Sequence, residues 1–415
     1  MGGEAGRGLV PQSAARGEFG FGLSVCYRIL ATRSLNNTEA RALKILVAAQ
    51  TSKDGGSLTF LTNLLRAIGD APAQDDWVFW IPQLLHDAFS VPSNVQMEFE
   101  QDSPDRKLYN FVANFKKRRN DRDRIFDLCQ RHQPDVVFVV TEFGFPGLAV
   151  PQVVLVRNRI YYDREWLSEL DSIPQKLNIL FRRLLAHRAM KAADHVLFPS
   201  KSMQDQVCST LSLQTPSSVI HYGGPIDVTP RTVAPSDNLR LLNISHYWPQ
   251  KNLVTLLEAV KLLHDQGVGI RLALTGDPSN SPGSRARRDQ ELVRELAGVV
   301  TITPNLPYKQ ALELYRSTDV FVFPSTCESF GHPMIEALFQ GVPVVAAETA
   351  INREICGDAA RYFPARDPEA LSKLLLKMKV DGLPTVDTED VRRRFNWTSY
   401  LESLSRVLHE VAESR

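Results

Sequence analysis

The sequence predicts an α/β protein with two doubly wound parallel-sheet domains. The first observation is a series of short, continuously apolar runs, which are typical of strands buried on both faces of a parallel sheet. The second is that segments with helical apolar spacing separate these runs, as in βαβ units. The third is that this alternation restarts after residue 238. The length agrees, because 415 residues suit two domains of about 150–200 residues each.

The first half of the chain contains the elements of one such domain. Residues 42–50, ALKILVAAQ, predict a buried strand, and leucines at helical spacing predict a helix between Ser57 and Ile68. Further apolar runs predict strands at residues 135–140, 151–157, 195–200 and 218–224. Together these elements predict an N-terminal domain over residues 42–224.

A stretch rich in Pro, Ser and Asp, residues 225–238, predicts a linker to a second domain over residues 239–395. Apolar runs predict its strands at residues 239–245, 270–276, 299–303, 319–325 and 342–348. Residues 396–415 predict a C-terminal helix, which can pack back on the N-terminal domain. Two such domains leave a cleft between the carboxyl ends of their strands, where ligands bind in this architecture.

Composition limits the class of protein. With 48 Lys and Arg against 47 Asp and Glu, bulk charge argues for neither a nucleic acid nor an acidic partner. No apolar run approaches the about 18 residues that span a bilayer. The five scattered cysteines form no C-x-x-C pair, so neither a zinc site nor a disulfide framework is indicated. A reducing, cytoplasmic compartment fits these features best.

Residues 1–41 differ from the rest of the chain. They are rich in Gly, Ala and Arg and show no steady apolar period. We expect a disordered leader, with an early start codon or a targeting peptide as alternatives.

The string CESFGHPMIEAL, residues 327–338, directly follows one of the expected strands. Pro333 is suited to the first turn of a helix, because the N–H that it lacks would have no partner there. Glu328 is therefore expected on the loop at the carboxyl end of the strand, and Glu336 about one turn into the helix. Gly341 ends that helix.

The start of this expected helix predicts a phosphate site flanked by two carboxylates. A helix N-terminus carries unpaired N–H donors and about half a positive charge, so it attracts phosphate. Carboxylates accept hydrogen bonds from pairs of hydroxyl groups, so the two glutamates suit the sugar and ribose of a nucleotide sugar. The alternative is a helix-dipole role for Glu336 and a solvated Glu328. The expected donor-binding residues of the loop are Ser329, Phe330, Gly331 and His332.

The string E-S-F-G-H-P-M-I-E-A resembles the E-x7-E signature of family 4 of the retaining glycosyltransferases with the GT-B fold. The resemblance covers roughly residues 43–413. It implies two Rossmann-like domains and transfer of a hexose-type sugar from a nucleotide-diphosphate sugar, as in polysaccharide biosynthesis. The implied acceptor is a glycan, a lipid-linked molecule or a small molecule. No metal or other cofactor is implied, and Glu328 would orient the sugar ring while Glu336 fixes the ribose.

The resemblance extends to other positions. Lys251 matches the family's diphosphate-binding lysine, and with Glu328 it is the expected catalytic pair. His246 stands where arginine is commonest in the family, and a neutral histidine supplies no fixed charge. Gly55 and Gly56 match a glycine-rich loop after the first strand. Asn158 lies where many members have a histidine near the donor sugar.

Two charged strings have less specific interpretations. Asp121-Arg122-Asp123 lies in a helix-like segment rather than a loop after a strand, so a metal site is not expected there. The basic run 116–119 is either a solvated helix face or a contact to an anionic membrane that carries a lipid-linked acceptor. The latter would make the protein peripheral to the inner membrane face. No nucleic acid partner is expected.

Two other functions remain open at this point. A nucleotide-sugar epimerase of similar two-domain fold should carry acid and base groups in its cleft and lack the motif that joins Glu328 and Glu336. A catalytically weak nucleotide-sugar-binding protein is compatible with the departures at His246 and Asn158. Turnover of a donor discriminates between these functions.

Overall fold

The computed structural model describes residues 41–53, 55–100, 111–170, 172–226, 228, 231, 236–279, 281, 284–304 and 306–414. Within this part of the chain, residues from Ala42 onward form one compact unit. The leader expected over residues 1–41, apart from Arg41, and much of the expected linker lie outside the described residues.

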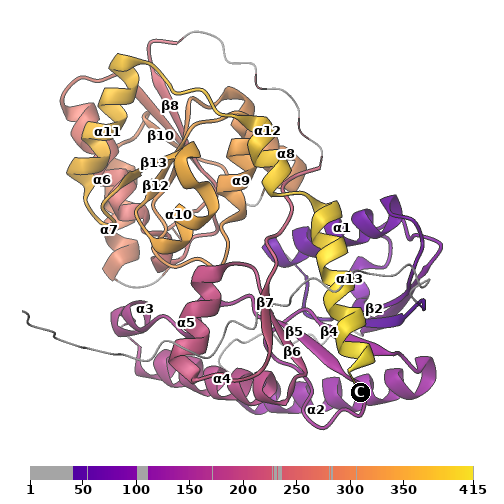
Figure 1. Cartoon of the computed structure of the whole chain (residues 1–415). Coiled ribbons are helices and arrows are strands. Elements are labelled where there is room, and N and C mark those ends of the chain that lie inside the picture. The colour runs from indigo at the N-terminus through magenta and orange to yellow at the C-terminus, as the bar shows by residue number, and fades with distance from the viewer. Residues whose placement is uncertain are drawn as a thin grey trace, which may run out of the picture. The chain divides into compact units, whose positions relative to one another are not determined.

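The described part of the N-terminal half forms a seven-stranded parallel sheet with the order β3-β2-β1-β4-β5-β6-β7 (Figure 1). Its strands are β1 (Lys44–Ala48), β2 (Asp76–Pro82), β3 (Val95–Glu100), β4 (Val136–Val139), β5 (Gln152–Leu155), β6 (His195–Phe198) and β7 (Ser217–Val219). Its helices are α1 (Gly55–Asp70), η1 (Gln83–Leu85), α2 (Phe111–His132), η2 (Arg159–Tyr161), α3 (Arg164–Glu169), α4 (Ile173–Ala192) and α5 (Lys201–Leu211).

The described part of the C-terminal half forms a second parallel sheet with the order β10-β9-β8-β11-β12-β13. Its strands are β8 (Leu239–Asn243), β9 (Ile270–Leu274), β10 (Val300–Ile302), β11 (Val320–Phe323), β12 (Val344–Ala347) and β13 (Ala360–Phe363). The helices are η3 (Pro249–Lys251), α6 (Leu253–Asp265), α7 (Ser284–Glu295), α8 (Tyr308–Leu314), η4 (Tyr315–Ser317), α9 (His332–Phe339), α10 (Ala350–Cys356), η5 (Gly357–Ala359), α11 (Pro368–Asp381), α12 (Thr388–Arg394) and α13 (Trp397–Glu413).

Both sheets are covered by helices on both faces, which explains the continuously apolar strands. In β1, Ile45 and Val47 pack toward α1 and α13, whereas Leu46 and Ala48 pack toward α2, α4 and α5. In the second sheet, α6, α7 and α11 cover one face and α9, α10 and α12 the other. The predicted fold class, two doubly wound domains, is therefore confirmed. We call β1 to β7 with their helices the N-terminal lobe, and β8 to α12 the C-terminal lobe.

Three strands of the structure, β2, β3 and β13, were not predicted from the sequence. The edge strand β3, VQMEFE, alternates apolar and polar residues and is only partly buried, so it lacks a continuous apolar run. Strand β2, DWVFWIP, is a buried and continuously apolar run that contains Val78 and Ile81, so its signal was present in the sequence and was overlooked. Strand β13 is another edge strand with only four residues, ARYF.

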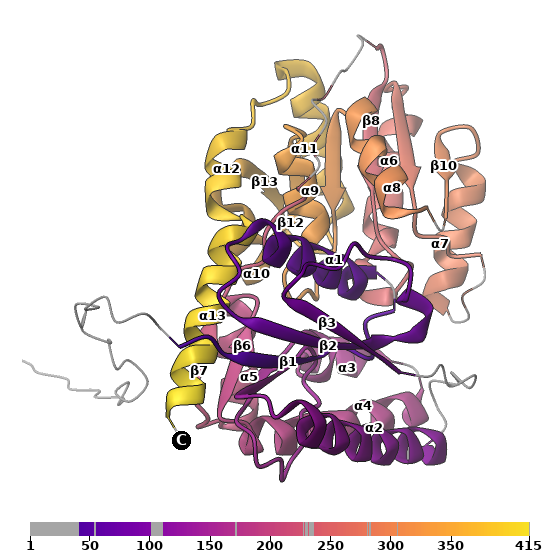
Figure 2. The same cartoon turned by 90° about the vertical axis from the view of Figure 1, so that its right-hand side faces the viewer.

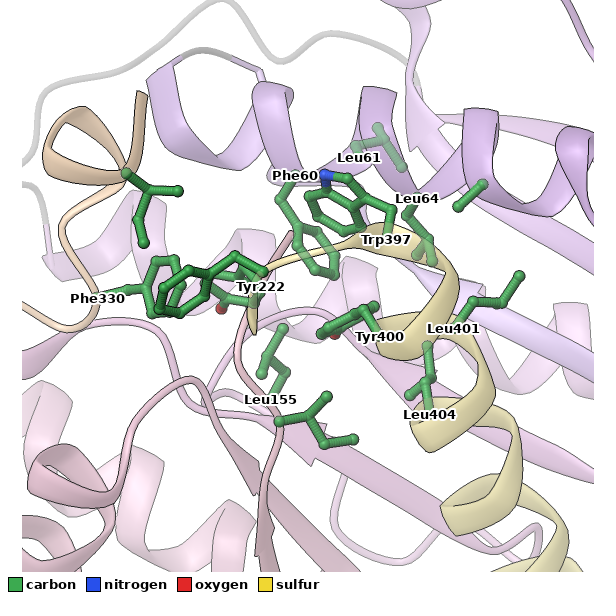
Figure 3. Close-up of a cluster of buried hydrophobic side chains, with 14 of the residues drawn as sticks. Phe60, Leu61, Leu64, Leu155, Tyr222, Phe330, Trp397, Tyr400, Leu401 and Leu404 are labelled. Atoms are coloured by element: carbon green, nitrogen blue, oxygen red, sulfur yellow. The ribbon is translucent and has the colours of Figure 1, made fainter. Parts of the chain in front are cut away.

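Helix α13 returns from the C-terminal lobe and lies against α1, β4 and β5 (Figure 1). Figure 3 shows the buried cluster that results, in which Phe60 of α1, Tyr222, and Trp397 and Tyr400 of α13 meet. The ring centroid of Phe60 lies 5.1 Å from that of Tyr222 and 5.8 Å from that of Trp397. Phe330 joins the cluster, with its ring centroid 4.9 Å from that of Tyr222. This cluster therefore fixes the start of α1 relative to the loop before α9.

Candidate active site

One large cavity is lined by residues of both lobes. Its volume is about 1970 Å³, whereas a site for one small molecule typically has about 300–1,000 Å³. The lining residues follow β1, β4 and β5 in the N-terminal lobe, and β8 and β11 in the C-terminal lobe. These are carboxyl ends of parallel strands, where such folds bind ligands. The cavity has room for two substrates at once.

Two residues predicted to be catalytic form an ion pair in this cavity. Nζ of Lys251, at the end of η3, lies 2.5 Å from Oε1 of Glu328. The side chains are 20% and 13% exposed, so the pair is mostly shielded from water but open to a ligand. The loop after β11 is anchored to η3, because the N–H of Thr326 donates to the carbonyl oxygen of Gln250 at 3.0 Å. A ligand that enters here meets a positioned cation and a positioned carboxylate.

Glu336 is the second glutamate of the motif and lies on α9. It is only 7% exposed but still lines the cavity. Burial raises the pKa of this carboxyl to about 7, and hydrogen bonds from Tyr315 and Tyr308 partly oppose the shift. The hydroxyl of Tyr315 donates to Oε2 of Glu336 at 3.1 Å. The site therefore holds a carboxyl that changes protonation state near neutral pH.

Two helix N-termini converge on the same part of the cavity. Gly55 begins α1 with φ of +54°, and Gly331 precedes α9 with φ of +91°. A Cβ atom built on Gly55 would lie 3.5 Å from Nε2 of His246, and one on Gly56 would lie 3.7 Å from Cδ2 of His332. The glycine-rich loop of one lobe thus lies next to both histidines of the other. Because helix N-termini attract anions, this arrangement favours a phosphate-bearing ligand.

The two predicted histidines differ in environment. His246 is exposed. The ring of His332 stacks on that of Tyr222, with centroids 5.1 Å apart and planes 5° apart. Burial, together with the charge of Arg157, lowers the pKa of His332 to about 4. His332 is therefore neutral at physiological pH, and it can donate or accept a hydrogen bond without adding charge.

The other predicted donor-binding residues have different positions. The carbonyl oxygen of Ser329 accepts a hydrogen bond from Oγ of Ser200 at 2.9 Å. Asn158 precedes η2 and lines the cavity. Phe330 is 1% exposed and its side chain belongs to the aromatic cluster of Figure 3 rather than to the cavity lining. Phe330 can therefore contribute only main-chain groups and support for the loop.

Three arginines that were not predicted as site residues line the N-terminal side of the cavity. The guanidinium of Arg118, on α2, lies 4.9 Å from the ring centroid of Phe143, and burial lowers its pKa. Arg182, on α4, donates to the hydroxyl of Tyr161 at 3.2 Å. Arg157 lies two residues after the end of β5. Among the described residues, no ion pair joins these three guanidinium groups to a carboxylate. We call Arg118, Arg157 and Arg182 the arginine arm.

A buried carboxyl lies near the arginine arm. Glu142, three residues after β4, is 4% exposed and lines the cavity. Burial raises its pKa, whereas the N–H groups of Glu142 and Arg157 and the charges of Arg157 and Arg182 oppose that shift. The signal that could have found Glu142 and Arg157 is their position just after apolar runs that end in the cleft.

The two charged strings belong to α2. Asp121 pairs with Lys117 at 2.8 Å between Nζ and Oδ1, and both residues line the cavity with Arg118. Part of the basic run 116–119 thus faces the cavity. Across the described ranges, no group of three or more His, Cys, Asp or Glu side chains is placed to hold a metal ion.

In the part of the chain that the structure describes, no helix is both long and apolar enough to cross a bilayer.

Residues 229–395 match the family of glycosyl transferases group 1. This group 1 segment contains Lys251, Glu328, Glu336 and His246, whereas Gly55, Gly56, Asn158 and the arginine arm lie outside it.

Curated relatives are glycosyltransferases. The chain is 32% identical over 177 residues to D-inositol 3-phosphate glycosyltransferase of Thermomonospora curvata, which covers 41% of each chain. It is 24% identical over 233 residues to the O-antigen chain mannosyltransferase RfbU of Salmonella typhimurium, which covers 54% of this chain and 60% of the relative. The chain thus spans between two fifths and three fifths of the length of these two relatives.

Solved structures share the fold over both lobes. The sucrose-phosphate synthase of Thermosynechococcus elongatus superposes with a TM-score of 0.72 at 16% identity, covering 90% of this chain and 100% of that chain. The Anabaena protein HepE in complex with UDP-glucose superposes with a TM-score of 0.65 at 16% identity, covering 89% and 100%. The fold outside the group 1 segment is therefore also that of GT-B glycosyltransferases.

Proposed function

We propose that this protein is a family 4 retaining glycosyltransferase that moves a hexose-type sugar from a nucleotide-diphosphate sugar to an acceptor. The acceptor would be a glycan, a lipid-linked molecule or a small molecule, as in polysaccharide biosynthesis. The observation that carries the proposal is the Lys251–Glu328 pair, which lies beside the converging N-termini of α1 and α9 in one cavity. The match of the group 1 segment supports the same class of reaction.

The donor diphosphate would lie between the two helix N-termini. There it would meet the N–H groups of the loop before α9, the glycine-rich start of α1, and Lys251. As the bond to the sugar breaks, negative charge grows on the leaving diphosphate. Donors that are already in place stabilise that charge without reorganising, which lowers the barrier to transfer. His246 and His332 would add hydrogen bonds, and His332 would add little charge because burial lowers its pKa to about 4.

The two glutamates would hold the two hydroxyl-bearing parts of the donor. Glu328 would bind sugar hydroxyls beside the reacting carbon, and its ion pair with Lys251 keeps its side chain oriented. Glu336 would accept from the ribose hydroxyls at the inner end of the site. Asn158 would contact the donor sugar from the N-terminal lobe. For retention we propose attack from the face that the diphosphate leaves, with a diphosphate oxygen accepting the proton of the acceptor hydroxyl.

The arginine arm would bind the acceptor. Arg118 is partly buried against Phe143, and a buried cation without an ion-pair partner is stabilised by a bound anion. We therefore propose an acceptor that carries a phosphate or a carboxylate. Arg118→Gln should lower kcat/KM for an anionic acceptor about tenfold and leave donor hydrolysis unchanged. Arg393→Gln, at an exposed position of α12, is the matched control. Equal losses for neutral and anionic acceptors would contradict this role.

We further propose that no metal ion or other cofactor is required, because Lys251 and the helix N-termini supply the positive charge that the diphosphate needs. The compartment would be the cytoplasm, with peripheral contact to the inner membrane face. The described cysteines Cys129, Cys208, Cys327 and Cys356 are free thiols, which suits a reducing compartment.

The test is a panel of UDP-, GDP-, ADP- and dTDP-sugars incubated with the purified full chain, with and without pooled lipids and glycans. Release of one nucleoside diphosphate is expected, with product anomers of unchanged configuration by NMR. Glu328→Gln should abolish release, whereas the matched variant Glu348→Gln, which is exposed and paired with Arg353, should not.

Other outcomes separate the alternatives. Tight donor binding without release in any acceptor mixture would indicate a binding protein and overturn the proposal. Conversion of one nucleotide sugar into its epimer would indicate an epimerase, which the match of the group 1 segment does not favour.

A further inference from the structure

Helix α4 exposes an unusual stripe of large apolar side chains. Twelve such side chains are exposed among the described residues, and five of them lie on this one helix. They are Ile173 (70% exposed), Leu177 (58%), Leu180 (36%), Phe181 (37%) and Leu184 (52%). Their spacing of i, i+4, i+7, i+8 and i+11 places them on one face of the helix. A contiguous exposed apolar patch of this kind marks an interaction surface.

The same helix carries only positive charge. The segment IPQKLNILFRRLLAHRAMKA contains no Asp or Glu but five Lys and Arg residues. At 100° per residue, Lys176, Arg183, Arg188 and Lys191 lie within or beside the apolar stripe. An apolar stripe bordered by cations is the pattern of helices that lie in the headgroup region of an anionic membrane.

The opposite face of α4 is the one that packs into the hydrophobic core, so the exposed stripe is a separate surface of this helix. Asn178, Ile179, Ala186, Ala189 and Met190 are buried against the N-terminal lobe. The helix is therefore already held in place by its inner face, and the outer stripe adds nothing to that packing. Figures 1 and 2 both show α4 at the outer edge of the N-terminal lobe, next to α2.

Helix α4 also reaches the cavity. Asn178, Phe181, Arg182 and Leu185 line it, so the outer stripe and the arginine arm are joined through one helix. Phe181 belongs to both surfaces. A molecule whose anionic group enters the arginine arm can therefore leave an apolar portion at the exposed stripe.

We propose that the outer face of α4 docks this protein on an anionic lipid surface, with the cavity opening toward acceptors held in that surface. The role of the acceptor rests on the proposed transferase function, whereas the docking itself does not. The basic run 116–119 is the weaker candidate for docking, because Lys117 pairs with Asp121 and Arg118 faces the cavity.

Charge argues against a second copy of the chain as the occupant of this face. A symmetric dimer through α4 would place two cationic helices without a single carboxylate opposite each other, and like charges repel. An anionic bilayer instead attracts the cations and accepts the apolar stripe.

The test is sedimentation of the full chain with vesicles of phosphatidylcholine alone or of equimolar phosphatidylcholine and phosphatidylglycerol. We expect binding to the mixed vesicles, weakened by salt because it is partly electrostatic. Leu177→Glu with Leu184→Glu should reduce binding more than tenfold. Arg188→Gln and Lys191→Gln should each reduce it about fivefold, as expected for one cation near an anionic surface. Val380→Glu, at a 74% exposed position of α11, is the matched control.

Each outcome decides one question. Absence of wild-type binding to both kinds of vesicle, or an equal loss with Val380→Glu, would overturn the docking proposal. A wild-type dimer in solution that the Leu177→Glu, Leu184→Glu variant converts to monomers would instead assign the face to a second copy. Donor hydrolysis without vesicles should be the same in wild type and this variant. If neither hydrolyses donor while vesicle binding persists, the transferase proposal fails and the docking proposal stands.

Discussion

The buried carboxyl of Glu336 should make stability depend on pH, and Glu336→Gln should remove that dependence. Glu336 is 7% exposed and burial raises its pKa from 4.5 to about 7. Between these two values the folded chain binds a proton that the unfolded chain has released. Stability from this group is therefore fully present below about pH 4.5 and is lost as the pH rises through about 7.

The magnitude follows from the shift. A difference of about 2.5 pKa units corresponds to about 3 kcal/mol between the two protonation states. The wild-type protein should lose about 1 kcal/mol of that stability by pH 5 and about 3 kcal/mol by pH 8. Glutamine has nearly the same shape and cannot ionise. The stability difference between variant and wild type should thus change by about 2 kcal/mol between pH 5 and pH 8, however well the amide packs.

Urea unfolding of both proteins at pH 5 and pH 8 measures this change, with Glu348→Gln as an exposed control. Nucleotide binding by calorimetry adds a second measurement, since the amide is a poorer acceptor for ribose hydroxyls. We expect a variant that gains stability at pH 8 but binds nucleotide more weakly. Parallel pH dependence in wild type and Glu336→Gln would refute the reasoning that burial governs this carboxyl.

Three other predictions test the site and its support. Lys251→Met should lower kcat for sugar transfer, measured by nucleotide release, by about 10²–10³, the usual effect of removing one preorganised charge-stabilising donor. An unchanged kcat would exclude Lys251 from the reaction. Gly224→Ala should destabilise the fold by about 1–3 kcal/mol, because a Cβ atom at this position would clash with the ring of Phe339. The variant should therefore have a lower Tm. An unchanged Tm would mean that the ring of Phe339 moves aside without cost. EDTA should leave transfer unchanged, whereas a loss of activity that Mg²⁺ restores would contradict the proposed cation-independent site.

Residues at the carboxyl ends of strands could be predicted from the sequence, because a continuous apolar run reveals both the strand and the loop that follows it. Glu328 follows β11, and Lys251 belongs to the first turn after β8. Parallel topology brings the carboxyl ends of β8 and β11 together, since these strands are paired. The string around Gly331 and Pro333 also contains the signals for the start of a helix. The position of Glu336 on α9 could therefore be predicted from neighbouring residues alone.

Two residues of the arginine arm could not be predicted in the same way. Arg118 and Arg182 lie on helices, and helical periodicity alone does not distinguish a cation that faces a cavity from one that faces water. The raised pKa of Glu336 could not be predicted from the sequence either, since it depends on burial and on Tyr315, twenty-one positions earlier in the chain. Both properties arise from contacts between segments that only the fold brings together.

The loop that carries Glu328 depends on the N-terminal lobe for its geometry. Arg159 donates to the carbonyl oxygen of Glu328 at 3.2 Å, and Ser200 donates to that of Ser329. The carboxylate of Glu354 on α10 accepts from two N–H groups at the start of α5, those of Lys201 at 2.6 Å and Ser202 at 2.7 Å.

Burial alone would raise the pKa of Glu354, but hydrogen bonds from His221 and from these N–H groups lower it, so the carboxylate stays charged at the positive end of α5. The group 1 segment thus contains Glu328 and Glu336, but the N-terminal lobe holds the loop between β11 and α9 in place. Because the loop carbonyls are bound across the cleft, any separation of the lobes would release Glu328 from Arg159. The arrangement proposed to be reactive is therefore a property of the two lobes together. Arg159 and Ser200 lie outside the group 1 segment but hold its loop by the carbonyl oxygens of Glu328 and Ser329, so in the proposed site they are positioning residues.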